Sequence, residues 1–246
     1  MNIYRYFKVR TVLLGLMSFA FLGSTIPSFS DSHTLSTFDY LKKDDDQTKK
    51  KLDVAKAVKK NLKRIKENSF VFDSKSKGTF LILAEFLCPN CHRIFEHVKD
   101  LDVQKMNINF WVLPLPTFGS ELSSQYGLIM KSAFESDSSK FMDVLSRYQT
   151  GNKETLLKLI KSDLEIQISD NVISDLSKYD PYKRLMTDLG VEFVPMLFYV
   201  LDDAKTSETV VIPLRNIAMK DLKVVIEKLS KLSENDLSEL KKTLNQ

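Results

Sequence analysis

The feature that most constrains this sequence is a pair of cysteines, two residues apart, between a strand-like run and a helix-like run. Residues Thr79–Leu87 (TFLILAEFL) are apolar or β-favouring, which predicts a buried strand. Apolar side chains recur at helical spacing within residues 92–99. The motif CPNC at residues 88–91 therefore falls where a helix begins. Unpaired N–H groups and the helix dipole favour a thiolate over a thiol at that position.

Cys88 and Cys91 in this setting suit thiol–disulfide exchange. Pro89 fits a helix start, because the N–H that it lacks would have had no intrahelical partner. Cys91 lies within one turn of Cys88, close enough to resolve a mixed disulfide formed there. As a structural staple the pair would be poor, since closing so short a loop removes little entropy from the unfolded chain. We therefore predict a redox-active Cys88–Cys91 disulfide that needs no cofactor.

Residues 1–30 have the pattern of a secretory signal. Basic residues at 5, 8 and 10 precede the apolar run Val12–Gly23, and small residues follow at Ser28 and Ser30. The run is too short to favour a transmembrane helix, and no cysteine lies nearby to carry a lipid anchor. We expect cleavage near Ser30 and export to an oxidising compartment.

The charge balance gives no reason to expect nucleic acid as a partner. The chain has 36 basic and 32 acidic residues, a formal net charge of +4. Without residues 1–30, which hold three basic residues and no acid, the balance is 33 against 32, or +1. A near-neutral mature protein lacks the electrostatic footprint of a nucleic-acid-binding surface.

Residues 31–68 form a lysine-rich segment with one narrow apolar stripe. Its members recur at steps of three or four: Leu52, Ala55, Val58, Leu62 and Ile65. Two interpretations fit this stripe. It belongs either to a solvated helix that rests one face on the domain behind it, or to a self-association seam through residues 42–66. An anionic membrane surface is a weaker candidate, since the stripe has no aromatic residue.

The remaining chain alternates between strand and helix patterns. Strands are predicted at 70–72, 108–115, 191–201 and 209–212, and the first crossover after the cysteines predicts a right-handed β–α–β unit with parallel strands. Residues 121–189 are mostly helical in pattern, with breaks near Asp137, Gly151 and Ser169. An amphipathic helix is expected at 217–232.

This order of elements resembles the DsbA family of periplasmic thiol–disulfide oxidoreductases. The resemblance rests on the CPNC motif between strand and helix, on the helical block at about 119–190, and on Val194-Pro195 at the start of the next strand. Leu113–Gly119 (LPLPTFG) is similar to a stretch in the subgroup with N-terminal extensions, which includes ScsC. The resemblance as a whole implies an α/β thioredoxin fold over residues 69–246 with an inserted helical domain, preceded by a helical extension at 31–68.

The resemblance also implies roles for single residues at the motif. Cys88 matches the nucleophile and Cys91 the resolving thiol. Pro89 and Asn90 occupy the pair that tunes the acidity of the nucleophile. The strongest oxidants of the family have histidine at the second of these positions. Because Asn90 adds no positive charge, we expect a less acidic thiol than theirs.

The resemblance also implies roles for Val194 and Pro195, and this chain departs from the family at Ile82. Pro195 is expected to be cis and to leave the main chain at Val194 free to pair with a substrate strand. Many members have a buried acid six positions before the first cysteine, where this chain has Ile82. Glu85, three positions before, either takes over proton handling or faces solvent at the end of the strand.

His92 opens two other interpretations of the motif. Residues 88–92 spell C-x-x-C-H, the attachment pattern of c-type haem. Together with His97, the cysteines and His92 also supply four potential zinc ligands, although all from one short segment. Neither explains the strands on both sides of the motif. We instead expect His92 on the helix surface beside the site, where a protonated ring would stabilise a thiolate.

We therefore predict an exported, periplasmic oxidoreductase that donates disulfides to unfolded or misfolded exported proteins. A membrane or soluble redox partner would recycle the dithiol. The CP-x-C form and the valine before Pro195 resemble the oxidising members. The extension resembles those that oligomerise isomerases and reductases, so an oligomeric isomerase is the alternative. A thioredoxin-like binding module without catalysis is the second alternative.

Overall fold

The structure is a computed structural model that describes residues 46–72, 76, 78–99, 108–148, 151–203, 208–214 and 222–231. The expected signal segment (1–30), the residues up to 45 and the chain beyond 231 lie outside these ranges. None of the described helices is long and apolar enough to cross a membrane.

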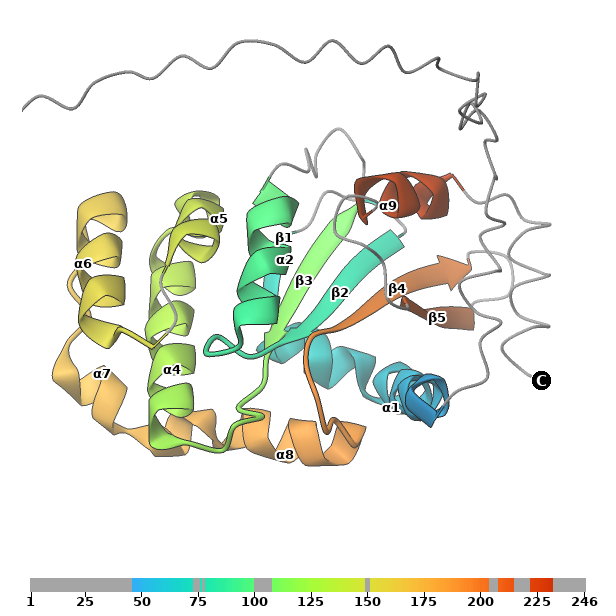
Figure 1. The fold of residues 1–246 in the computed structure, drawn as a ribbon, viewed down its shortest axis with the longest axis horizontal. Coiled ribbons are helices and arrows are strands. Elements are labelled where there is room, and N and C mark those ends of the chain that lie inside the picture. The colour runs from blue at the N-terminus through green and yellow to red at the C-terminus, as the bar shows by residue number, and fades with distance from the viewer. Residues whose placement is uncertain are drawn as a thin grey trace, which may run out of the picture. The chain divides into compact units, whose positions relative to one another are not determined.

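The described strands form a five-stranded mixed sheet with the order β1-β3-β2-β4-β5. Its members are β1 (Phe70–Phe72), β2 (Gly78–Ala84), β3 (Asn109–Pro114), β4 (Met196–Asp203) and β5 (Glu208–Leu214). β2 and β3 run parallel, and the other pairs are antiparallel. The predicted parallel β–α–β unit is confirmed (Figure 1).

β2 lies in the centre of the sheet, and every one of its residues is buried. Successive side chains of a strand point to opposite faces. Accordingly Phe80 and Ile82 belong to one apolar cluster, whereas Leu81 and Leu83 belong to another. The continuous apolar run in the sequence is thus the signature of a strand covered on both faces.

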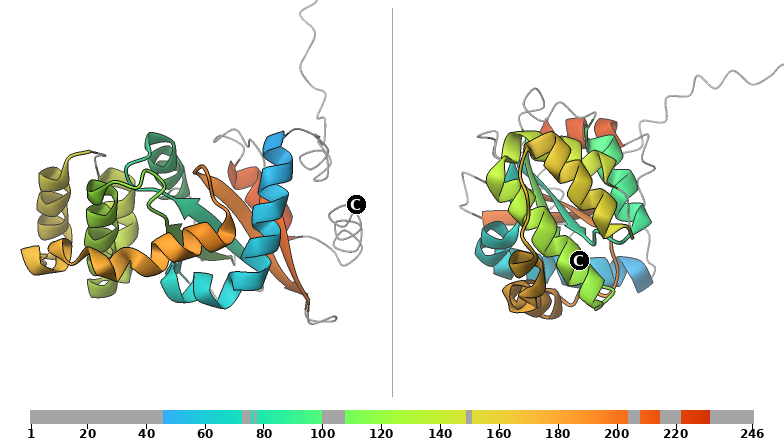
Figure 2. Two further views of the ribbon diagram at one scale, coloured as in Figure 1. Left: turned by 90° about the horizontal axis from the view of Figure 1, so that it is seen from below. Right: turned by 90° about the vertical axis from the view of Figure 1, so that its left-hand side faces the viewer.

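Helices cover both faces of the sheet (Figures 1 and 2). The first cluster includes side chains from α2 (Pro89–Lys99), α4 (Glu121–Ser136), α5 (Ser138–Arg147) and α9 (Leu222–Ser230). The second includes side chains from α1 (Asp46–Asn68) and α8 (Asp180–Leu189). This layering confirms the predicted α/β class.

The block between β3 and β4 is helical, as predicted. It consists of α4, α5, α6 (Lys153–Leu164), α7 (Asp170–Ser174), the 3₁₀ helix η2 (Leu176–Tyr179) and α8. Polar side chains cap these helices at or next to the predicted breaks: Asp137 accepts hydrogen bonds from the first turn of α5, and Asn152 accepts one from α6. Ser120, at the end of the loop between β3 and α4, caps α4 in the same way.

The apolar stripe of the lysine-rich segment packs on the sheet of its own chain. Ala55, Val58 and Ile65 of the stripe are buried in the second cluster, together with the neighbouring Val54 and with sheet residues such as Trp111, whereas Leu52 and Leu62 are partly buried. Of the two interpretations, a helix resting one face on the domain is therefore confirmed. Self-association through residues 42–66 stays a prediction, because residues 42–45 lie outside the described ranges and Leu52 and Leu62 are only partly buried.

Candidate active site

The two cysteines are placed by a tight turn between β2 and α2. β2 ends at Ala84, and the backbone N–H of Cys88 donates to the carbonyl of Glu85 at 3.0 Å. The backbone N–H of His92 then donates to the carbonyl of Cys88 at 3.1 Å, which is the first helical bond of α2. Cys88 is thus the residue before the helix and Cys91 lies in its first turn. Both are free thiols, so the geometry is that of the reduced pair.

Cys88 is the acidic thiol of the pair. A hydrogen bond from the thiol of Cys91 lowers its pKa to about 6, and the backbone N–H groups of Cys91 and Asn90 contribute in the same direction. Burial opposes this shift but does not cancel it. At neutral pH Cys88 is therefore mostly thiolate, the form that attacks disulfides.

Cys91 has the opposite character. It is fully buried, and its Sγ lies 3.4 Å from the backbone N of Glu85, which donates to it. Burial raises the pKa of Cys91, and the hydrogen bond that it donates to Cys88 adds to the increase. The arrangement thus separates an acidic sulfur near the surface from a protonated sulfur beneath it.

The predicted partner of the cysteines from the second half of the fold is in place. The Val194-Pro195 peptide bond is cis, as expected, and Pro195 lies immediately before β4. The carbonyl oxygen of Val194 lies 3.9 Å from the Sγ of Cys88. The segment is 106 residues away in sequence, so the antiparallel pairing of β2 with β4 brings the two together.

Glu85 is buried beside the pair, which decides between the two orientations left open by the sequence. Its side chain accepts a hydrogen bond from the hydroxyl of Ser123 at 2.6 Å and one from the backbone N–H of Leu87 at 3.2 Å. Burial raises the pKa of Glu85, although these bonds and others from the backbone of Phe118 and Thr117 lower it. Ile82, at the position of the missing acid, is fully buried in the apolar cluster.

His92 makes its contacts with α2 and the inserted helices. Its ring packs edge-on against Tyr148 with centroids 4.9 Å apart, and its Nε2 lies 3.5 Å from the carboxylate of Glu96. Tyr148 is buried and donates to the carbonyl of Phe86 at 3.0 Å. Sequence patterns gave no signal for Tyr148 or Ser123, because both reach the site across long sequence separations.

The geometry also bears on the haem and zinc alternatives. Within the described residues, no three His, Cys, Asp or Glu side chains cluster in a way that could hold a metal ion. His97 is exposed on α2. A c-type haem bonds to both sulfurs of its motif, whereas Cys91 is completely covered by protein.

Pro89 and Asn90, the two residues between the cysteines, are exposed next to Cys88.

Several solved structures share this fold. The catalytic domain of Proteus mirabilis ScsC matches with a TM-score of 0.54 at 16% identity, over 72% of this chain and 99% of that one. Salmonella enterica Typhimurium BcfH gives a TM-score of 0.55 at 11% identity, over 75% and 83%. The Wolbachia pipientis thiol-disulfide exchange protein α-DsbA2 gives 0.50 at 16% identity, over 74% and 98%. The predicted DsbA-like thioredoxin fold with a helical insertion is thereby confirmed.

The match is one of fold only, at identities far below those that carry an activity from one protein to another. No family model matches the sequence, and neither does any curated protein. The activity of this chain therefore has to be argued from its own site.

Proposed function

We propose that this chain is an exported thiol–disulfide oxidoreductase that donates disulfides to unfolded exported polypeptides. The observation that carries the proposal is the acidic thiol of Cys88, with a pKa of about 6, facing the carbonyl of Val194 across 3.9 Å. A purely structural cysteine does not need a lowered pKa, whereas a thiol that exchanges disulfides reacts as the thiolate and therefore depends on it. The secretory pattern of residues 1–30 supports export to the periplasm.

The reaction begins with the Cys88–Cys91 disulfide and two substrate thiols. A substrate thiolate attacks the sulfur of Cys88, a mixed disulfide forms, and Cys91 leaves and takes up a proton. A second substrate thiolate then attacks the substrate sulfur of the mixed disulfide, and Cys88 leaves as a thiolate. The substrate loses two electrons, which the dithiol keeps until an oxidised redox partner accepts them.

The acidity of Cys88 supports the oxidising direction. A thiol of low pKa is a good leaving group, and its stabilised thiolate favours the reduced form of the protein, so its disulfide is a stronger oxidant. Nucleophiles with a pKa near 7 and near 3.5 accompany potentials of about −270 mV in thioredoxin and about −120 mV in DsbA. At about 6, Cys88 lies between these two. The expectation of a less acidic thiol than that of the strongest oxidants agrees with this.

The main chain at Val194 is the proposed contact for the substrate backbone. Its carbonyl lies next to the sulfur of Cys88, and Val194 is itself partly exposed. An extended polypeptide pairing with this segment would bring its own sulfur toward Cys88, in the manner of strand addition at a sheet edge.

Glu85 is the proposed proton-handling group for Cys91. The carboxyl is 2% exposed, and its negative charge raises the pKa of both cysteines. A neutral carboxyl favours loss of the proton from the dithiol, so proton exchange at Glu85 and thiolate formation are coupled. This would let Glu85 substitute for the acid that is missing at Ile82.

Two cysteine variants test the proposal. Cys88→Ser should abolish thiol oxidation and insulin reduction, whereas Cys91→Ser should accumulate mixed disulfides between Cys88 and substrate proteins. Full activity in Cys88→Ser would refute the assigned nucleophile. An oligomeric isomerase would instead rearrange a scrambled substrate faster than it oxidises a reduced one. A binding module would show neither activity in the wild type.

A further inference from the structure

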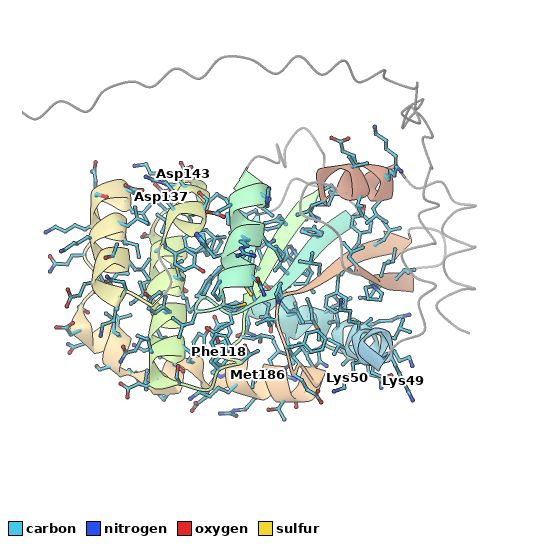
Figure 3. All side chains as sticks on the ribbon, viewed as in Figure 1. Lys49, Lys50, Phe118, Asp137, Asp143 and Met186 are labelled. Atoms are coloured by element: carbon cyan, nitrogen blue, oxygen red, sulfur yellow. The ribbon has the colours of Figure 1, made fainter. Side chains whose placement is uncertain are left out.

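Tyr148 is a buried residue of the insertion whose hydroxyl reaches the active-site turn. It is the C-cap residue of α5, a helix that begins after Asp137, labelled in Figure 3, and lies side by side with α2 (Figure 1). Its hydroxyl donates to the carbonyl of Phe86 at 3.0 Å. Because Phe86 lies between Glu85 and Cys88, a residue of the insertion holds the turn that presents the nucleophile.

A single peptide group joins Tyr148 to the carboxylate of Glu85. The carbonyl of Phe86 and the N–H of Leu87 belong to the same planar group. Its carbonyl accepts the Tyr148 hydroxyl, and its N–H donates to Oε1 of Glu85 at 3.2 Å. The other carboxylate oxygen, Oε2, accepts the hydroxyl of Ser123 at 2.6 Å. The insertion thus reaches both oxygens of one buried carboxylate, from α4 directly and from the end of α5 through the peptide group.

This connection acts on the charge of Glu85. A hydrogen bond to the carbonyl of a peptide group fixes the orientation of the group and polarises its N–H, which strengthens the bond from that N–H to a carboxylate. The N–H of Leu87 lowers the pKa of Glu85, against the opposite effect of burial. Burial raises the pKa of Tyr148 well above its ordinary value, so the phenol stays a donor while the thiols react.

Other titratable groups also face this arrangement. They come from the active-site turn, α2, α4 and η2, and they are Cys88, Cys91, His92, Tyr126 and Tyr179. Burial raises the pKa of both tyrosines, so they stay neutral while the thiols react. The ring of His92 meets the ring of Tyr148 edge-on, and its Nε2 lies 3.5 Å from Glu96. The Glu85→Gln background used below separates an effect of His92 from an effect of the carboxylate.

We propose that Tyr148 is a positioning residue for Glu85: through the peptide group between them, it holds the carboxylate ready to take the proton of Cys91. This inference rests on the proposed function and adds a residue to its proton handling. When a mixed disulfide at Cys88 is resolved, Cys91 gives its proton to Glu85 and attacks the sulfur of Cys88 as a thiolate. The bond from Cys88 to the substrate breaks, the substrate sulfur leaves as a thiolate, and Glu85 releases the proton to solvent. In the oxidising direction the same steps run in reverse.

The test follows the two steps with dithiobis-nitrobenzoate, an aromatic disulfide that releases one coloured thiolate at each step. On the reduced full-length mature protein, the first release reports the attack of Cys88 and the second reports closure of the Cys88–Cys91 disulfide. Tyr148→Phe keeps the ring and removes only the hydroxyl. It should slow the second release roughly fivefold on the acidic limb of its pH profile and leave the alkaline plateau within about twofold, because Glu85 then ionises only at higher pH.

Tyr179→Phe is the matched control for the loss of a buried hydroxyl. Tyr179 is also buried, and its hydroxyl donates to the carbonyl of Pro114 at 3.3 Å. The N–H of that peptide group belongs to Leu115 and donates to the carbonyl of Ala84 rather than to a carboxylate. Tyr179→Phe should therefore keep the wild-type pH profile of the second release.

A second comparison places Tyr148→Phe in the Glu85→Gln background. With no carboxylate to position, the hydroxyl should have no further effect on the second release, so the effects of the two substitutions should not add. An unchanged profile in Tyr148→Phe would overturn the positioning role and leave the exchange reaction intact. A slowdown that is equal at every pH, that also appears in Tyr179→Phe, or that persists in Glu85→Gln would do the same. A wild-type protein that releases no coloured thiolate would overturn the proposed function, and the positioning role with it.

Discussion

The backbone N–H of Glu85 lies 3.4 Å from the Sγ of Cys91, and the carbonyl of Glu85 accepts the N–H of Cys88 at 3.0 Å. One residue at the end of β2 therefore positions both cysteines through its main chain. Its carboxylate meanwhile accepts the hydroxyl of Ser123 in α4. The strand end, the active-site turn and the inserted helices are thus joined at a single buried acid.

The first prediction concerns the pH dependence of Cys88. Because its pKa is lowered to about 6, alkylation of the reduced protein should accelerate as pH rises from 5 to 7 and then level off. The thiolate is the reactive form, so the rate follows its fraction. Rates of iodoacetamide labelling, with mass analysis to confirm that Cys88 carries the label, measure the midpoint. A midpoint near 8.5, the value of an ordinary thiol, would show that the site does not acidify Cys88.

The second prediction separates the contribution of Cys91 to that acidity. Its thiol is the largest cause of the lowered pKa of Cys88. Cys91→Ala removes the donor and should shift the labelling midpoint of Cys88 to higher pH. Cys91→Ser keeps a hydroxyl donor and should shift it less. Equal midpoints in the two variants would mean that the helix N–H groups, rather than this hydrogen bond, set the acidity.

The third prediction concerns Glu85→Gln. The substitution removes a negative charge that raises the pKa of Cys88, so the labelling midpoint should move to lower pH. The amide cannot exchange protons with the dithiol. The attack of Cys88 on an oxidising disulfide should therefore keep its rate, whereas the following step, in which Cys91 closes the Cys88–Cys91 disulfide, should become slower. Single-turnover kinetics resolve the two steps. Unchanged resolution would remove Glu85 from proton handling.

The fourth prediction tests the packing of the insertion at Gly127. A Cβ built there would lie 2.1 Å from the ring of Tyr179, which is buried, stacked on Tyr182 and hydrogen-bonded to Pro114. Gly127→Ala should therefore destabilise the protein by about 1–3 kcal/mol, although a helical glycine-to-alanine change gains about 1 kcal/mol elsewhere. Denaturant unfolding measures the difference. In a Tyr179→Leu background the cost should fall, and an undiminished cost would locate the strain elsewhere.

The fifth prediction separates packing from self-association at α1. Val58 is fully buried, so Val58→Asp places an unpaired charge in the core and should lower the free energy of unfolding by about 3–5 kcal/mol. The neighbouring exposed residue provides the control, Lys59→Asp, which should have little effect. Unfolding curves together with light scattering distinguish the outcomes. A lower mass in Val58→Asp with an unchanged free energy of unfolding would instead show that α1 holds two copies of the chain together.

The sequence made the central elements predictable because their signals are local. A continuous apolar strand, a proline at a helix start and polar caps at helix breaks each act within a few residues, and β2, α2 and the inserted helices follow them. The resemblance to the DsbA family added Pro195, which lies far away in sequence but next to Cys88 in space.

Long-range contacts were beyond the reach of these patterns. Whether Glu85 faced solvent depended on Ser123, 38 residues later, and the packing of His92 depended on Tyr148. The stripe of α1 has the same period whether a second copy or its own sheet covers it. Only the position of α1 against β3, β5 and α8 shows that its own domain covers part of the stripe.

The equilibrium between the Cys88–Cys91 pair and a glutathione redox buffer tests the central claim most directly. The account predicts a reversible disulfide with a potential between about −270 and −120 mV, the values of thioredoxin and DsbA. A pair that never forms a disulfide, or one with a potential below about −300 mV as in structural disulfides, would contradict it.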